Sequence, residues 1–336
     1  MVSRGEWAAA RRAGVPNARI SLEGIGKSPA DLRAAVRAAR DGEPLLWIAL
    51  ESPDEAEALA RLARRSGVRL DVLYRLNPDV APETLAVLAV GAGASKFGMD
   101  ETEISAAIQA GGGPDGPLRP RGIHLHVGSQ LGAVDAWRDA VRKALALAAL
   151  WRGSIATFDT VDLGGGFPVR AEGEPSPSPE RFARELPRLL AAVPADRRPT
   201  RLAVEPGRVL VARAGWLVAR VLHVRERSGR QAIIDAGMTE LIRPALYGAH
   251  HRVVALTSLG RPVDGMAANA DAPPDTAPTR VEGPICESTD SLGTHDLPPL
   301  RRGDLVAIAD AGAYAASQRS RYNGRPNVPH VFIPGP

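Results

Sequence analysis

The sequence predicts a TIM-like α/β barrel followed by a mostly antiparallel β domain. From about residue 20 to residue 210, short apolar runs alternate with amphipathic helical patterns, as in a parallel sheet covered by helices. Polar and glycine residues fall at the carboxyl ends of these runs, where barrel enzymes place their chemistry. After about residue 212, the runs stay β-like but no helical pattern separates them. These three observations together favour the two-part fold.

The first half follows an order of strand, helix, strand. Residues 45–52 (LLWIALES) are predicted to be a buried strand. Residues 52–67 are predicted to be a helix with Ser52 as N-cap, acids in the first turn, arginines in the last turn and a terminal glycine. The further predicted strands span residues 68–78, 122–129, 158–166 and 201–208, and the further helices span residues 134–153 and 179–193. So many units in series favour a barrel over an open sheet.

The second half contains four β-type runs: GWLVARVLHVRERSG, QAIIDAG, HRVVALTS and GDLVAIADAGAY. Residues 262–280 are rich in Ala, Pro and Asp, and we expect them to form a mobile surface loop. We therefore divide the chain into a barrel over residues 1–212 and a β domain over residues 213–336.

Composition excludes several classes of function. The net charge is +4, and the arginines alternate with acids along predicted helices, which indicates solvated helix faces and no nucleic-acid partner. No apolar run is long enough to span a bilayer, so we expect no membrane partner. Cys286 is the single cysteine, so no internal disulfide can form. The first residues lack the apolar core of a signal peptide, and we expect a cytoplasmic protein.

Three motifs end strands of the predicted barrel: HLHVGSQ (124–130), DLGGGFP (162–168) and EPGR (205–208). His126 lies beside a Gly-Ser turn that offers a backbone N–H and a hydroxyl to an anion. The three glycines let backbone amides approach a phosphate closely. Glu205 could keep a pyridine nitrogen protonated. Taken singly, a core histidine, a tight turn and a strand-end salt bridge are the commoner interpretations.

Three further motifs lie in the β domain: LIRPALYGAHH (241–251), GPICESTDS (283–291) and DAGAYAASQRSRYN (310–323). Cys286 beside Glu287 could donate a proton next to a cation-binding carboxylate, although a lone cysteine is usually an inert apolar residue. Tyr314 could bind a phosphate or could simply be a packed tyrosine.

Each motif alone is weak evidence of function, but the order of the motifs along the chain is stronger evidence. SKFG, HxHVGSQ, DLGGGFP, EPGR, RPALY, CES-D and GAY occur in the order in which they occur in fold-type III decarboxylases that depend on pyridoxal 5'-phosphate. The chain resembles the ornithine/diaminopimelate/arginine group of that family over nearly its whole length, and the diaminopimelate branch matches best. The resemblance implies a homodimer with shared active sites and pyridoxal phosphate bound at the rim of an eight-stranded barrel.

The resemblance also implies roles for individual residues. His126 would stack on the pyridine ring, and Glu205 would pair with the ring nitrogen. Cys286 would act across the dimer interface and return a proton to the substrate carbon after CO2 leaves, so Cys286 and His126 are the catalytic candidates. The residues implied around the cofactor phosphate are Ser129, Gly164, Gly165, Gly166, Gly207, Arg208 and Tyr314.

The residue after the cysteine bears on substrate choice. Ornithine decarboxylases carry Asp there, whereas this chain has Glu287, as the diaminopimelate enzymes do. Arg208 and Arg243 add guanidiniums suited to a bidentate contact with a distal carboxylate. With Tyr247 and Tyr314 they favour meso-diaminopimelate as the amino-acid substrate and L-lysine as product. The alternative is another carboxylated amino acid in a secondary pathway.

The chain contains three lysines, and none matches the family's Schiff-base lysine, which lies on the first barrel strand. Lys96 matches the SKFG lysine, Lys27 a turn lysine, and Lys143 lies mid-helix. The start MVSRGEW matches a motif of the second strand, so we expect the first strand and helix to be absent and two strand edges to be exposed. We favour a truncated reading of a longer gene. The alternatives are a separate polypeptide that completes the barrel and a non-catalytic binding or regulatory paralogue.

Overall fold

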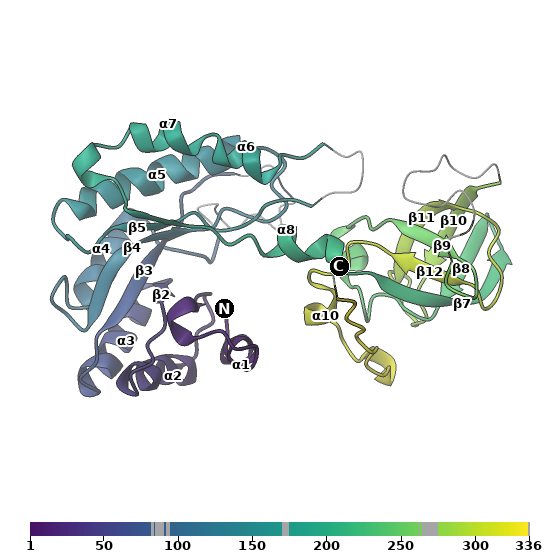
Figure 1. The fold of residues 1–336 in the computed structure, drawn as a ribbon, viewed down its shortest axis with the longest axis horizontal. Helices are drawn as coiled ribbons and strands as arrows, with labels where there is room; N and C mark the ends of the chain where they lie inside the picture. The colour runs from purple at the N-terminus through teal and green to yellow at the C-terminus, as the bar shows by residue number, and fades with distance from the viewer. Residues whose placement is uncertain are drawn as a thin grey trace. The chain divides into compact units, whose positions relative to one another are not determined.

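The chain folds into two compact units in the computed structural model (Figure 1). Unit 1 comprises Met1–Pro168 and Ser176–Pro206, and unit 2 comprises Val169–Pro175 and Gly207–Pro336. The structure describes residues 1–81, 84, 91, 95–169, 175–261, 263 and 275–334. Among these residues, no helix combines the length and the apolar character that a membrane span requires.

Unit 1 alternates strands and helices, as the sequence predicts. Its strands are β1 (Ser21–Leu22), β2 (Trp47–Leu50), β3 (Leu70–Leu76), β4 (Leu118–Leu125), β5 (Thr160–Asp162) and β6 (Arg201–Ala203). In its described residues the α-helices are α1 (Arg4–Arg12), α2 (Pro29–Arg40), α3 (Pro53–Arg65), α4 (Glu101–Ala110), α5 (Asp135–Arg152), α6 (Pro179–Ala183) and α7 (Leu186–Ala191), and the 3-10 turns are η1 (Asn17–Arg19) and η3 (Ala195–Arg197).

The six strands of unit 1 form one parallel sheet in the order β1-β2-β3-β4-β5-β6. Because right-handed crossovers return the chain to the same face each time, this sequential order is that of a barrel wall. Glu23 follows the edge strand β1 and Glu205 follows the edge strand β6, yet both lie within 4 Å of His124 on β4. The sheet therefore curls, and the predicted barrel-like fold is confirmed.

Local sequence signals account for the helices of unit 1. Ser52 accepts a hydrogen bond from the Glu55 amide and begins α3, as predicted. Helix α5 buries a stripe that repeats every three or four residues, including Trp137, Val141 and Leu145, against β4 and β5. The predicted helix over residues 179–193 is instead the two helices α6 and α7. Pro187 lies where they meet, and it has no N–H to continue the helix.

Several predicted strands are shorter or displaced. The strand expected over residues 122–129 begins four residues earlier and ends at Leu125, and the strand expected over residues 158–166 is Thr160–Asp162. The glycines that follow leave the sheet because Gly164 and Gly166 have positive φ angles. The strand expected over residues 201–208 ends at Ala203, and residues 207–211 are helical.

Unit 2 contains a second six-stranded sheet, in the order β11-β10-β8-β7-β12-β9. The strands are β7 (Leu217–Glu226), β8 (Arg230–Ile234), β9 (Val253–Leu256), β10 (Ala277–Glu282), β11 (Ser291–Leu297) and β12 (Leu305–Ile308), and the helical segments are α8 (Gly207–Val211), η4 (Ala212–Ala214), α9 (Arg243–Tyr247), α10 (Ala315–Gln318) and η5 (Tyr322–Gly324). All neighbouring pairs are antiparallel except β8 with β10, which confirms the predicted mostly antiparallel domain.

Two features of unit 2 differ from the sequence prediction. Strands β10 and β11 and the short helix α9 were not predicted. The loop expected over residues 262–280 includes residues 277–280, which lie in β10, so the expectation is wrong there. Residues 262 and 264–274 lie outside the described residues. The core of unit 2 is formed by Val221, Ile234, Val281, Val306 and Ile308 with their neighbours from every strand of the sheet.

Candidate active site

Three strand ends bring His126, Glu205 and the glycine loop together in unit 1. The Gly165 amide donates a hydrogen bond to His126 Nδ1 at 3.1 Å, and the Glu205 amide donates to the Gly164 carbonyl at 2.9 Å. The first bond requires Nδ1 to be the acceptor, so the proton of the neutral ring lies on Nε2. Burial lowers the pKa of His126, and the nearby cations Arg75 and His124 lower it further, although Glu205 opposes them. His126 is therefore a neutral imidazole at pH 7.

The loop after β5 requires glycine at three successive positions, because a Cβ atom at any of them would overlap a backbone carbonyl. The separations would be 2.2 Å between Gly164 and the Leu125 oxygen, 2.4 Å between Gly165 and the Glu205 oxygen, and 2.1 Å between Gly166 and the Gly128 oxygen. The Gly164 and Gly165 amides are already bonded, to Asp162 Oδ1 and to His126. The Gly166 amide has no acceptor among the described residues, which leaves it available to an anion.

A buried ionic cluster underlies Glu205. His124 Nε2 lies 3.2 Å from Glu205 Oε1 and 3.8 Å from Glu23 Oε2, and only 2% of the His124 surface is exposed. Burial opposes protonation of His124, but Glu205, Glu23 and Asp162 outweigh it and raise the pKa of His124 to about 9. Burial raises the pKa of Asp162 to about 6, against the influence of His124. His124 is therefore an imidazolium between carboxylates at neutral pH.

Sequence reasoning missed His124, Glu23 and Asp162. The two-residue spacing of His124 and His126 was an available signal, because residues i and i+2 of a strand share a face. Nothing in the sequence marks Glu23, which follows a strand of two residues and meets His124 only because the sheet curls.

The rim of unit 1 fits a flat ring with a protonated nitrogen and an anionic substituent. Glu205 Oε1 is buried and makes no hydrogen bond of normal geometry, although His124 is near, so it can accept one from a ring N–H. The neutral imidazole of His126 can stack without charge repulsion, and the Gly166 amide can donate to the anion. The ring nitrogen, the ring face and the anionic group of such a ring therefore each have a candidate partner here, whereas none of the three lysines lies at the site.

Four of the predicted phosphate and substrate residues gather in unit 2. The Arg208 guanidinium lies over the Tyr314 ring, 4.5 Å from its centroid. Burial and the nearby Arg208 lower the pKa of Arg243 to about 10, while Tyr247 and Tyr314 act in the opposite direction. His251 Nε2 lies 3.4 Å from Arg243 Nη1 and holds that guanidinium in place. Two guanidiniums brought together in this way form a site for an anion.

Cys286 and Glu287 form a second group in unit 2. Tyr322 Oη donates to Glu287 Oε1 at 2.6 Å, and Asn323 Nδ2 donates to Cys286 Sγ at 3.2 Å. The buried Asp290 accepts hydrogen bonds from the amides of Met238 at 2.6 Å and Ile285 at 2.9 Å, which fixes the turn before Cys286. Tyr322, Asn323 and Asp290 were not assigned a role from sequence, although Asp290 is the final residue of the CES-D motif.

Ser129 and Gly207, two residues predicted to surround the cofactor phosphate, have contacts that do not point to a phosphate site. The carbonyl of Ser129, in unit 1, accepts a hydrogen bond from Thr84 Oγ1 at 2.6 Å. Gly207, at the start of α8 in unit 2, is exposed, and a Cβ atom there would meet nothing within 4 Å. Its position therefore does not require glycine for steric reasons.

The three lysines all lie away from the cluster around Glu205. Lys27 has no exposed side-chain surface and pairs with Glu55 at 3.0 Å, and Lys143 Nζ donates to the Pro78 carbonyl. Lys96 Nζ lies 5.2 Å from the Phe97 ring centroid. In the described part of the chain, no lysine makes an ion pair or hydrogen bond with His126, Glu205 or the glycine loop.

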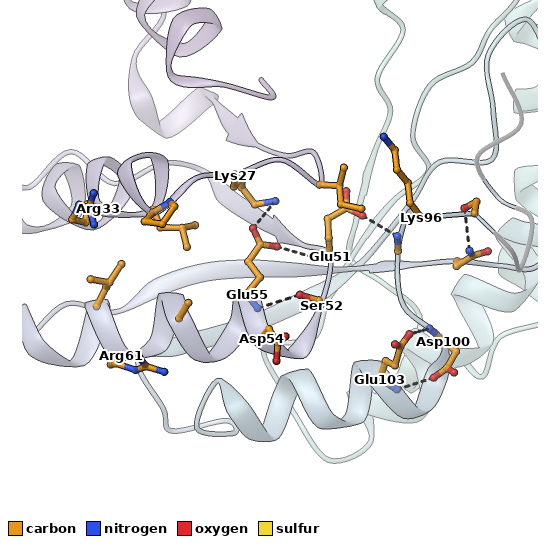
Figure 2. Close-up of a pocket in the computed structure, with 18 of the residues that line it drawn as sticks. Lys27, Arg33, Glu51, Ser52, Asp54, Glu55, Arg61, Lys96, Asp100 and Glu103 are labelled. Carbon is orange, nitrogen blue, oxygen red and sulfur yellow. Dashed lines mark hydrogen bonds and ion pairs between the residues drawn. The ribbon is translucent and has the colours of Figure 1, made fainter. Parts of the chain in front are cut away.

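Lys27 and Lys96 line a separate cavity of about 1140 Å³ in unit 1, between α2, α3 and the start of α4 (Figure 2). Figure 2 shows Lys27 directed at Glu55, which projects from the first turn of α3. Glu51, on the same wall, accepts a hydrogen bond from the Gly98 amide and pairs with Arg75. Because its buried charges are paired within unit 1, this cavity carries no strong net charge from them.

Comparisons with known proteins agree with this chemistry. Residues 1–212 match the family model described as pyridoxal-dependent decarboxylase, pyridoxal binding domain. Diaminopimelate decarboxylase of Aquifex aeolicus is 33% identical over 99% of this chain and 74% of its own length, and that of Pseudomonas aeruginosa is 34% identical over 100% and 75%.

A solved structure extends the likeness to three dimensions. The crystal structure of diaminopimelate decarboxylase from Helicobacter pylori complexed with L-lysine has a TM-score of 0.83 and 30% identity, covering 96% of this chain and 75% of that one. The chain therefore belongs to the family of pyridoxal-dependent decarboxylases.

Proposed function

We propose that this protein binds pyridoxal 5'-phosphate and decarboxylates meso-diaminopimelate to L-lysine and CO2. The observation that carries the proposal is the buried acceptor Glu205 Oε1 beside the neutral ring of His126, within residues that match a pyridoxal-binding domain. Residues 1–212 would form the cofactor-binding domain, and residues 213–336 would contribute substrate and dimer contacts. Pyridoxal phosphate supplies, when bound, a protonated ring that accepts the electrons left on the substrate carbon when CO2 departs.

The residues of unit 1 would orient the ring and hold its proton. Glu205 would accept a hydrogen bond from the ring nitrogen, and the negative charge of its carboxylate favours the protonated ring. His126 packs against the ring face, and its Nδ1 is fixed by the Gly165 amide. The Gly166 amide donates to the phosphate, and we propose that Ser129 contributes a hydroxyl to it.

The residues of unit 2 would select the substrate. Arg208 and Arg243 present two guanidiniums to anionic groups, namely the cofactor phosphate and a distal carboxylate, with Tyr247 and Tyr314 beside them. Glu287 would bind the distal ammonium, and its carboxylate is held by Tyr322. Cys286 would return a proton to the carbon that lost CO2. We propose that it does so in the site of a second copy, so that the working enzyme is a homodimer.

Release of CO2 from carboxyl-labelled meso-diaminopimelate and from ornithine tests the proposal. With added pyridoxal phosphate, we expect faster release from meso-diaminopimelate, because Arg243 and Glu287 complement its distal carboxylate and ammonium. Arg243→Gln should raise KM for meso-diaminopimelate and leave KM for ornithine nearly unchanged. The exposed Arg225→Gln serves as the matched control. Faster release from ornithine would overturn the substrate assignment.

A second candidate function is a non-catalytic, cofactor-binding protein. The placement of the three lysines favours it, because Lys27 and Lys143 are engaged elsewhere and Lys96 stacks beside Phe97. Bound pyridoxal phosphate without CO2 release from any amino acid would support this candidate over the enzyme.

A further inference from the structure

We propose that Glu23 is a positioning residue that acts through His124 to keep Glu205 negatively charged and the cofactor ring nitrogen protonated. The inference rests on the proposed function, because it concerns the same site. It adds a residue from the opposite edge of the sheet, outside every motif that marks the site in the sequence.

The geometry places one imidazole beside two carboxylates, and the ligand atoms of all three side chains lie within 4.8 Å of one another. His124 Nε2 lies 3.2 Å from Glu205 Oε1 and 3.8 Å from Glu23 Oε2, so the same nitrogen faces both. Glu23 is 8% exposed and His124 2% exposed, so water screens their charges poorly, whereas the Glu205 side chain is 32% exposed. Ser21 Oγ donates to Glu23 Oε1 at 2.6 Å and fixes the orientation of that carboxylate.

The summed charge of Glu205, His124 and Glu23 explains how Glu23 favours a protonated cofactor ring. Glu205 and His124 alone would form a neutral pair, and a neutral pair gives a cationic ring little electrostatic advantage. Glu23 adds a second carboxylate to one imidazolium, so the three side chains carry one negative charge in excess. A protonated pyridine ring at Glu205 offsets that excess, so the charges of these three side chains and the ring sum to zero.

The other titratable groups near the cluster add negative charge, are already paired, or are neutral. Asp162, on β5, adds negative charge near His124, although its carboxylate is also bonded to the Gly164 amide. Arg75, on β3, lies near His126 but is paired with Glu51. His126 is neutral and adds no charge. Loss of the Glu23 charge therefore removes one of the three carboxylates around His124 and reduces the excess negative charge that favours the ring proton, while Glu205 and Asp162 remain.

The pH titration of bound pyridoxine 5'-phosphate, labelled with 15N in the ring, tests the inference. The ring 15N chemical shift reports the proton directly, and this ligand has no aldehyde, so it needs no lysine. In Glu23→Gln the isosteric amide still accepts the Ser21 hydrogen bond but carries no charge. We expect the ring nitrogen to lose its proton at a pH lower by about one unit or more than in the wild type.

A second measurement requires no ligand. In the protein alone, the 15N resonances of His124 should show that Glu23→Gln lowers the pKa of the imidazolium, since one of its two carboxylate partners is gone. Glu23→Asp, which keeps the charge on a shorter side chain, should restore both titrations in part. The exposed Glu57→Gln, which breaks only a surface pair with Arg61, should change neither.

The outcomes separate this inference from the proposed function. If wild-type protein binds pyridoxine phosphate and Glu23→Gln leaves the titrations of the ring and of His124 unchanged, Glu23 has no such role while the cofactor site stands. If wild-type protein fails to bind pyridoxine phosphate, both the proposed function and this inference fall.

Discussion

At the residue scale, the most unusual group is His124, an imidazolium enclosed by carboxylates on three strand ends. Buried charges are expensive unless they are paired, and here the pairing links residues 81 and 101 positions apart in the sequence. A site assembled from such distant residues depends on the curvature of the sheet. The pairing of these charges consequently exists only in the folded protein, so it affects the free energy of unfolding.

The raised pKa of His124 makes stability depend on pH. Because the folded state holds this proton more tightly than the unfolded state, the contribution is complete below pH 6.5 and is lost as pH rises through about 9. We expect the free energy of unfolding to fall by as much as about 3 kcal/mol over that interval. Urea unfolding at several pH values measures it, and His124→Gln should abolish this part of the pH dependence. An equal loss of pH dependence in the exposed His223→Gln would contradict the assignment.

The glycine loop provides a matched pair of substitutions. Gly164→Ala places a Cβ atom 2.2 Å from a backbone oxygen at a positive φ of 66°, and we expect it to destabilise the protein by about 2 kcal/mol or more. Gly207→Ala meets nothing within 4 Å and should change stability little. Chemical denaturation of the two variants measures the difference, and equal stabilities would show that the loop does not need glycine.

At the element scale, β6 is an edge strand with apolar side chains in solvent. Leu202 in β6 is 36% exposed and Val204, directly after the strand, is 50% exposed, and exposed apolar edges promote association between chains. We expect Leu202→Lys to reduce self-association without loss of secondary structure. Sedimentation velocity over a range of protein concentrations, with circular dichroism as the control, measures the change. Unchanged or stronger association would show that this edge does not mediate it.

The sequence predicted those elements whose signals are local. Helix α3 follows from a serine cap, early acids and a terminal glycine, and β2 follows from an apolar run. Strands β10 and β11 escaped prediction because the buried polar residues Thr279 and His295 take inward positions, so the alternation of apolar and polar residues is interrupted. The division of one predicted helix into α6 and α7 depends on Pro187, which was not read as a breaker.

The same limit applies to the site. His126, Glu205 and the glycines lie in recognisable motifs at strand ends, so sequence order was enough to identify them. Glu23 lies in no motif, and His124 begins the HLHVGSQ motif but has no role assigned from it, because their contact arises only when both edges of the sheet curl toward β4. Long-range electrostatic pairing of this kind is specified by packing across the whole sheet.

At the scale of the whole molecule, the lysines and the cofactor site occupy different places. Lys27 is fully shielded and ion-paired, and Lys143 is bonded to a carbonyl. After borohydride treatment with pyridoxal phosphate, we therefore expect peptide mass spectrometry to find no pyridoxyl group on either residue. Lys96 is exposed and should react as a surface amine that excess pyridoxine phosphate does not protect. Protected labelling of any of the three would show that it reaches the cofactor site.

The most direct test of the central claim, that Glu205 and its neighbours bind the pyridine ring of pyridoxal phosphate, is a calorimetric titration with pyridoxine 5'-phosphate. We expect binding by the wild type and a loss of at least about tenfold in affinity for Glu205→Gln, because a charged hydrogen bond to the ring nitrogen is removed. Undetectable binding by the wild type, or equal affinity in the two proteins, would contradict the claim.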